Sequence, residues 1–86
     1  EIDRRLVELA GWQRDGNRIR RTFELPSFPA AIAFVNRVAG LAEEANHHPD
    51  IEIRHRAVTL VLSTHSAGGL TATDLDVAGK IDRLPS

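Results

Sequence analysis

Three of the four histidines fall in two segments that could share one acid–base site. His47 and His48 are adjacent in an Asn-His-His-Pro run, and His65 follows an apolar, strand-like run. Histidine has an unperturbed pKa of about 6.5, so its side chain can both give and take a proton near neutral pH. The carboxylates Glu43 and Asp74 lie near these histidines in the sequence. The pattern predicts general acid–base chemistry.

The two adjacent histidines are expected to lie where a long helix ends and the chain turns, because Pro49 cannot continue a helix. A single histidine at a helix C-terminus is often explained by its favourable interaction with the helix dipole. Two adjacent histidines held by a proline, together with a third after a strand, favour a functional site instead. Glu43 lies four residues before His47, on the same helical face, and is expected to orient that imidazole.

The positions of His65 and Asp74 within the predicted elements bear on their roles. His65 shares a strand face with Thr59 and Ser63 rather than with the leucines of that strand, so it is not expected in the core. Asp74 is the third residue after Thr71, a place where a carboxylate stabilises the start of a helix. The spacing favours this capping role, which can coexist with a role in the site.

A zinc site is the main alternative for the three histidines. Neutral imidazoles suit zinc, and three of them would leave an open catalytic position. Adjacent histidines usually point in different directions, however, and the sequence has neither two histidines four residues apart nor a His-Glu-x-x-His motif. We therefore expect no metal. The glycine pair at 68–69 lacks the further residues of a phosphate-binding loop, and His55, between two arginines, is expected to be exposed.

The composition limits the classes of protein to consider. Eighty-six residues make one domain, over 1–86, and the absence of cysteine excludes disulfides and thiolate metal sites. Eleven basic against twelve acidic residues argue against binding to nucleic acid or to an anionic membrane. No apolar stretch approaches the roughly 20 residues that span a bilayer. The N-terminus lacks both the apolar core of a signal peptide and an initiator methionine, so we expect a cytoplasmic protein and a trimmed or partial chain.

Apolar spacing and turn residues predict the order of the elements. A short helix is predicted over 3–10, a β-hairpin over 12–25 with its turn at 15–17, and a helix of about 18 residues from Phe28. Two strands over 51–54 and 57–64 and a helix that begins after Thr71 complete the chain. The order αββαββα predicts an α+β fold, with a four-stranded antiparallel sheet and helices packed on one face.

The second strand of the hairpin carries three arginines among apolar residues. Arg18 and Arg20 fall on the polar side of its alternation, whereas Arg21 falls on the apolar side with Ile19 and Phe23. We expect the arginines to form a solvated face rather than a ligand site.

Three motifs together resemble one known family, the pterin-4a-carbinolamine dehydratases, whose animal members are also dimerisation cofactors of a homeodomain transcription factor. The motifs are Glu43-x-x-Asn46-His47-His48-Pro49, then Thr64-His65, then Gly69-Leu70-Thr71-x-x-Asp74. The resemblance covers nearly the whole chain and implies the αββαββα fold.

The resemblance implies a hydro-lyase that removes water from a 4a-hydroxytetrahydropterin to give the quinonoid dihydropterin, in the recycling of tetrahydropterin. It implies that the pterin is the substrate, with no cofactor and no metal. Carried over, His47, His48 and His65 line the pterin site and hold the proton donor and acceptor among them. Glu43, Pro49, Thr64 and Asp74 would bind the substrate or orient these histidines.

Two other functions stay open, a homo-oligomeric binding module that stabilises a partner protein and a metal-dependent hydrolase. In every case we expect a homodimer, or a homotetramer built from dimers. Helices can cover only one face of a four-stranded sheet of this size, and an open sheet edge invites strand pairing. Two-fold symmetry is the commonest closed arrangement of such subunits.

Overall fold

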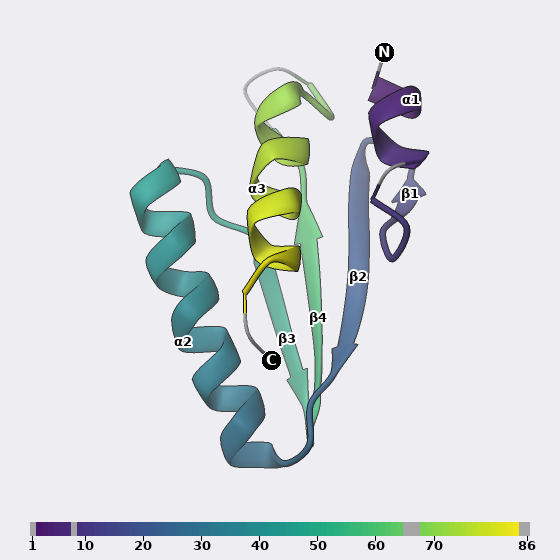
Figure 1. Cartoon of the computed structure of the whole chain (residues 1–86). Helices are drawn as coiled ribbons and strands as arrows, with labels where there is room; N and C mark the ends of the chain where they lie inside the picture. The colour runs from purple at the N-terminus through teal and green to yellow at the C-terminus, as the bar shows by residue number, and fades with distance from the viewer. Residues whose placement is uncertain (1, 8, 65–67, 85–86) are drawn as a thin grey trace.

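The computed structural model describes residues 2–7, 9–64 and 68–84 and shows three helices against one antiparallel sheet (Figure 1). In chain order the elements are α1 (Ile2–Val7), β1 (Gln13–Asp15), β2 (Arg18–Glu24), α2 (Phe28–Ala45), β3 (Asp50–Arg54), β4 (Ala57–Leu62) and α3 (Ala72–Asp82). The strands are ordered β1-β2-β4-β3, and every neighbouring pair is antiparallel. The predicted α+β fold of order αββαββα is confirmed.

The long helix α2 begins and ends at residues that suit these positions. The Ser27 side chain caps its start by accepting a hydrogen bond from the Ala30 N–H at 3.2 Å. Asn46, at the C-terminal end, adopts the left-handed conformation with φ of 52°, which asparagine tolerates well. The His47 N–H then donates to the Ala42 carbonyl at 3.0 Å. The chain therefore turns sharply at Asn46, and this turn directs the two histidines that follow.

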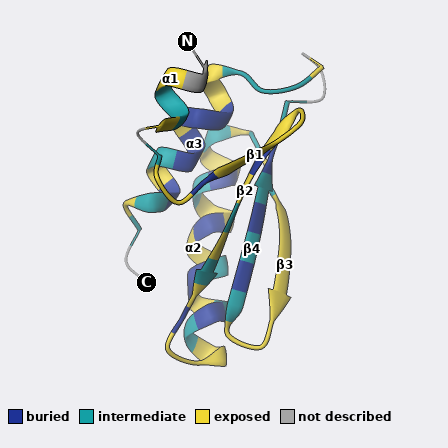
Figure 2. Cartoon of the chain, turned by 90° about the vertical axis from the view of Figure 1, so that its right-hand side faces the viewer, coloured by how far each residue is buried: buried dark blue, intermediate teal, exposed yellow. Residues whose placement is uncertain are grey.

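The core lies between the sheet and the two longer helices, and β4 is central to it. Alternate residues of β4 are buried against the helices, as the strand alternation predicted (Figure 2). The buried hydrophobic side chains of the described chain are Trp12, Ile19, Leu25, Ala31, Phe34, Val38, Ala42, Val58, Leu60, Leu62, Leu75, Val77, Ala78 and Ile81. Because β4 is paired on both sides, the segment that leaves it toward Thr64 starts from a fixed position.

The prediction of a solvated arginine face is right for Arg18 and Arg20, which are exposed, and wrong for Arg21. The Arg21 side chain lies on the helix side of the sheet, where its guanidinium donates to Asp82 at 3.0 Å and lies 4.5 Å over the Phe23 ring. Its alternation with the apolar residues placed it there, and the carboxylate of α3 compensates its charge.

The sheet has one polar face, and its edge at β3 is exposed. On the face away from the helices, the Thr22 and Thr59 hydroxyls are 2.8 Å apart. The edge strand β3 is exposed along its whole length, and Ile51 and Ile53, which point to the helix side, remain 39% and 38% exposed. Among the helices that the structure describes, none has the length and apolar character needed to cross a membrane.

Candidate functional site

Asp74 is the centre of a buried hydrogen-bond cluster. Its side chain is fully buried, with 0% exposure, and its Oδ1 lies 2.5 Å from His47 Nε2. Its Oδ2 accepts from the Thr64 hydroxyl at 2.8 Å and from the Thr71 N–H at 3.0 Å. The Thr64 and Thr71 hydroxyls are also 3.0 Å apart. A buried carboxylate is costly unless it is hydrogen-bonded, and these partners meet that need.

Three segments that are far apart in the sequence build this cluster. His47 leaves the end of α2, Thr64 follows β4, and Asp74 lies in the first turn of α3. The Asp74 carboxylate binds the N–H of the helix cap Thr71 and also binds His47. The capping role predicted for Asp74 is therefore present together with a contact to a candidate site histidine.

The sequence predicted that Glu43 would orient His47, but in the structure Glu43 contacts His48 instead. Glu43 Oε1 is 2.8 Å from His48 Nε2. The helical spacing of four residues pairs Glu43 with His47 only if the helix continues, and the left-handed residue Asn46 ends it. The turn sends His47 inward to Asp74 and brings His48 over the last helical turn.

The two adjacent histidines have different environments. The His47 side chain is 13% exposed and is held by a carboxylate that is itself fixed. The His48 side chain is 60% exposed and contacts Glu43, which is 81% exposed. Exposed pairs of this kind are weak, so a ligand can replace that contact at small cost. His47 is thus the oriented imidazole and His48 the accessible one.

The hydrogen-bond network assigns the tautomer of His47. Asp74 Oδ2 accepts from the Thr71 N–H, and an ionised carboxylate can only accept hydrogen bonds, so with Asp74 ionised the proton shared with His47 is assigned to Nε2. In the neutral imidazole Nδ1 is then the acceptor atom. A carboxylate that holds one ring nitrogen in this way leaves the other nitrogen for proton transfer.

The remaining predicted site residues are placed as follows. Pro49 is half-buried directly after His48, and Thr64 forms a backbone bridge with Gly69 through two hydrogen bonds of 3.1 Å. His65 lies outside the described residues. Among the residues that are described, no group of three or more histidine, aspartate or glutamate side chains could hold a metal ion.

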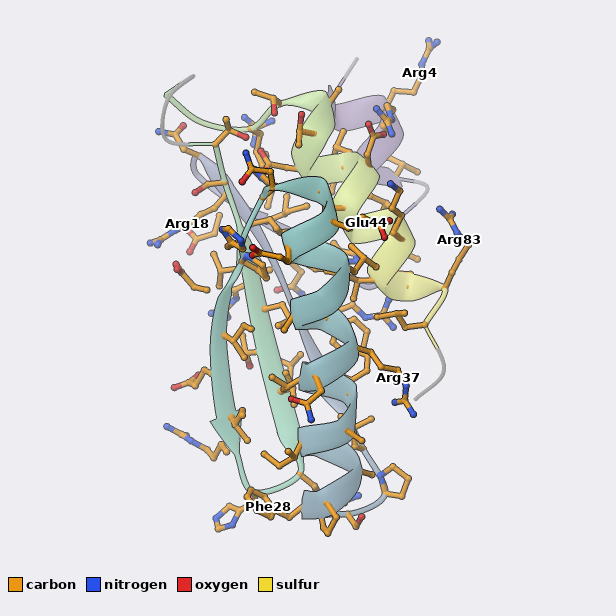
Figure 3. The ribbon with its side chains drawn as sticks, turned by 90° about the vertical axis from the view of Figure 1, so that its left-hand side faces the viewer. Arg4, Arg18, Phe28, Arg37, Glu44 and Arg83 are labelled. Atoms are coloured by element: carbon orange, nitrogen blue, oxygen red, sulfur yellow. The ribbon has the colours of Figure 1, made fainter. Side chains whose placement is uncertain are left out.

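A cavity of about 550 Å³ lies next to the cluster, at the end of the sheet. We call it the sheet-end cavity; its lining residues are Asp15, Gly16, Asn17, Arg18, Asp50, Ser63, Thr64, Gly68 and Gly69. Thr64 belongs to both the cavity and the Asp74 cluster. Figure 3 shows Arg18 extending from the sheet near the C-terminal end of α2, whereas Phe28 marks the N-terminal end of that helix. The sequence indicated the turn at 15–17 but gave no signal that it would border the site.

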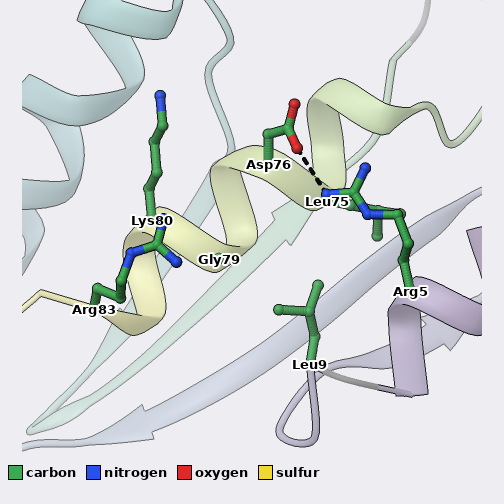
Figure 4. A pocket seen from close by; sticks show the side chains of 7 residues that line it. All are labelled: Arg5, Leu9, Leu75, Asp76, Gly79, Lys80 and Arg83. Atoms are coloured by element: carbon green, nitrogen blue, oxygen red, sulfur yellow. Dashed lines mark hydrogen bonds and ion pairs between the residues drawn. The ribbon is translucent and has the colours of Figure 1, made fainter.

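A second cavity, of about 410 Å³, lies between α1 and α3 (Figure 4). Its polar lining includes Arg5, whose guanidinium lies 2.7 Å from Asp76, as well as Lys80 and Arg83. It contains none of the candidate site residues. Of these two cavities, it is the sheet-end cavity that adjoins the Asp74 cluster, through Thr64.

Comparisons with known proteins agree with the motifs. The family described as pterin 4 alpha carbinolamine dehydratase matches residues 1–84. A protein from Roseiflexus castenholzii is 66% identical over 84 residues, which make up 98% of this chain and 90% of that protein. One from Nocardia farcinica is 58% identical over 98% of this chain and 88% of that protein. Both are provisionally named pterin-4-alpha-carbinolamine dehydratases.

A solved structure gives the same result. The crystal structure of a transcriptional coactivator/pterin dehydratase from Brucella melitensis is 33% identical to this chain and has a TM-score of 0.90. The match covers 95% of this chain and 89% of that one. The resemblance drawn from the histidine motifs is thus confirmed, and this chain belongs to the pterin-4-alpha-carbinolamine dehydratase family.

Proposed function

We propose that this protein dehydrates a 4a-hydroxytetrahydropterin to the quinonoid dihydropterin by histidine acid–base catalysis, without a metal or cofactor, and so serves tetrahydropterin recycling. The observation that carries the proposal is the pairing of a buried, oriented imidazole with an accessible one. His47 is fixed by the buried carboxylate Asp74, and His48 beside it is exposed. Membership of the family supplies the substrate class.

The proposed reaction needs only two proton transfers. The C4a–O bond breaks as the hydroxyl takes a proton and leaves as water, the N5–H proton passes to a base, and a C4a=N5 double bond forms. Donor and acceptor are among His47, His48 and His65, and each transfer by a positioned side chain is typically worth about 10²–10⁴-fold. Asp74 and Thr64 are positioning residues, because Asp74 holds His47 and the Thr64 hydroxyl donates to Asp74.

Stopped-flow absorbance with synthetic 4a-hydroxytetrahydropterin tests the proposal. His48→Asn removes the accessible imidazole, and His55→Asn is the matched control in the exposed β3–β4 turn. Asparagine is chosen because His55 has φ of 58°, a left-handed conformation that asparagine tolerates. We expect His48→Asn to lose about 10²-fold or more in rate and His55→Asn to match the wild type. A wild-type rate equal to that of buffer, or an unchanged rate in His48→Asn, would refute the proposal.

The alternative is a non-catalytic binding module that stabilises a partner protein. It is favoured by the name of the Brucella melitensis structure, which describes that protein as a transcriptional coactivator as well as a pterin dehydratase. The same assay separates the two functions. Activity that is lost in His48→Asn while circular dichroism shows an intact fold supports the enzyme, and a wild type without activity supports the module.

We also propose that the chain assembles as a homodimer, or as a homotetramer of dimers. The edge strand β3 is exposed throughout, and Ile51 and Ile53 leave apolar surface beside its unpaired backbone. Exposed edges of this kind pair readily with another strand. Sedimentation equilibrium at micromolar concentration is expected to show at least two subunits. A stable monomer of 9.5 kDa would contradict this.

A further inference from the structure

The outer end of the sheet places several polar side chains around the sheet-end cavity. Asp15 and Arg18 are directly opposite each other in the β1–β2 pair. Arg18 and Ser63 each lie one residue beyond the paired residues Ile19 and Leu62, whose side chains face the core. Side chains alternate along a strand, so Asp15, Arg18 and Ser63 project to the face away from the helices.

Asp50 completes this arrangement from the other edge of the sheet. It pairs with Val61 of β4, on the outer face, and it is the second residue after His48. Asp50 therefore connects the cavity to the accessible histidine along the chain, as Thr64 connects it to Asp74.

The charged groups of the cavity have no partners within the described part of the chain. Asp15, Arg18 and Asp50 form no ion pair or side-chain hydrogen bond there, although all three line the same cavity. Elsewhere on the outer face, by contrast, Glu52 lies 3.9 Å from Arg54. Single unpaired charges are common on surfaces. Two carboxylates and a guanidinium around one cavity instead suit a ligand that offers both donors and acceptors.

The wall formed by the β1–β2 turn is held in place by close packing. A Cβ atom added at Gly69 would lie 3.3 Å from the side chain of Asn17, so the turn already lies tightly on Gly69. Gly69 is in turn bridged to Thr64. Gly69 therefore connects the cavity wall to the Asp74 cluster, since it lies against the Asn17 side chain and is hydrogen-bonded to the Thr64 backbone. The volume of about 550 Å³ is within the usual range of small-molecule pockets.

From this arrangement we infer that the sheet-end cavity binds the pyrimidine edge of the pterin ring, with Asp50 accepting from its 2-amino and N3–H groups and Arg18 donating to its 4-oxo group. This inference rests on the proposed function for the identity of the ring. A carboxylate can accept both adjacent N–H groups at once, and a guanidinium suits a carbonyl oxygen. C4a lies across the pyrimidine ring from C2, so this binding mode places the reacting C4a and N5 atoms on the side of the ring away from the Asp50 contact.

Comparing the binding of pterin with that of lumazine distinguishes specific recognition by Asp50 from a general electrostatic effect of its charge. Lumazine carries a 2-oxo group where pterin has the 2-amino group, so it presents an acceptor to the Asp50 carboxylate. Equilibrium binding measured by ligand fluorescence is expected to show wild-type protein binding pterin at least about tenfold more tightly than lumazine. In Asp50→Asn the amide can donate to the 2-oxo group, so the preference is expected to fall to within about threefold.

Glu52→Gln is the matched control, because it removes one negative charge from the same strand and the same face but does not line the cavity. Its preference for pterin is expected to equal that of the wild type. No pterin binding by the wild type, an undiminished preference in Asp50→Asn, or an equal loss in Glu52→Gln would overturn the inference. Asp50-dependent preference in a protein without dehydratase activity would overturn only the proposed function. Activity with a preference independent of Asp50 would overturn only this inference.

Discussion

Replacing Asp74 by asparagine tests whether the buried cluster both stabilises the protein and orients His47. The substitution keeps the shape of the side chain but makes one of its two acceptor atoms a donor. The Thr71 N–H still needs an acceptor, so the amide oxygen is expected to stay on the Oδ2 side and the NH₂ group to face His47 Nε2. Two donors cannot share that contact. His47 must then carry its proton on Nδ1, which removes the acceptor atom.

The structure sets the expected size of both effects. Hydrogen bonds to a charged group contribute about 1.5–3 kcal/mol each and neutral ones about 0.5–1.5 kcal/mol, while burial of a neutral amide costs less than burial of a carboxylate. For a fully buried group with partners on both oxygens, we expect Asp74→Asn to lower the free energy of unfolding by about 1–3 kcal/mol. We expect the dehydration rate to fall by about 10²–10⁴-fold, because the His47 imidazole is then in the wrong tautomer for its proton transfer.

Asp76→Asn is the matched control, on the same helix with the same change of charge. Asp76 is 60% exposed and pairs with Arg5 at the surface, so its loss is expected to cost well under about 1 kcal/mol. Urea unfolding followed by the fluorescence of Trp12, the single tryptophan and a buried one, measures both variants at equal protein concentration. If Asp74→Asn unfolds at the same urea concentration as Asp76→Asn and keeps the wild-type rate, the role given to the cluster is wrong.

Three further predictions concern catalysis and packing. The enzyme-catalysed rate is expected to be bell-shaped around neutral pH, since one imidazole must be protonated and another neutral; a flat profile from about pH 6 to 9 would contradict paired acid–base work. Gly69→Ala is expected to destabilise the fold by about 1–3 kcal/mol in thermal unfolding, because Gly69 has φ of 154° and little free space. Gly40 lies in open space on α2, so Gly40→Ala is expected to raise the stability by about 0.5–1 kcal/mol. Arg21→Gln is expected to cost about 1–2 kcal/mol through the loss of its contacts with Asp82 and the Phe23 ring, and exposed Arg20→Gln almost nothing. Equal urea midpoints for the two variants would count against a stabilising role for the Arg21 contacts.

The features whose causes are local could be predicted from the sequence. The bounds of α2 follow from an apolar repeat together with the caps Ser27 and Asn46, and the structure has this helix over Phe28–Ala45 as expected. The alternation in β4 likewise identified its buried side chains, and the spacing of Thr71 and Asp74 identified the start of α3. Each of these depends on hydrogen bonds or side-chain faces within a few residues, so the pattern carries enough information.

Which side chains contact one another depends on the tertiary structure. The sequence paired His47 with Glu43, four residues away, but its partner is Asp74, 27 residues away, because the turn at Asn46 changes the direction of the chain and α3 packs beside α2. In the same way Arg21 was expected in solvent, yet its guanidinium donates a hydrogen bond to Asp82, which lies 61 residues further along the chain. The turn at 15–17 likewise borders the sheet-end cavity because segments that are distant in the sequence pack together there. Contacts between distant segments depend on how whole elements pack, and no local pattern encodes that packing.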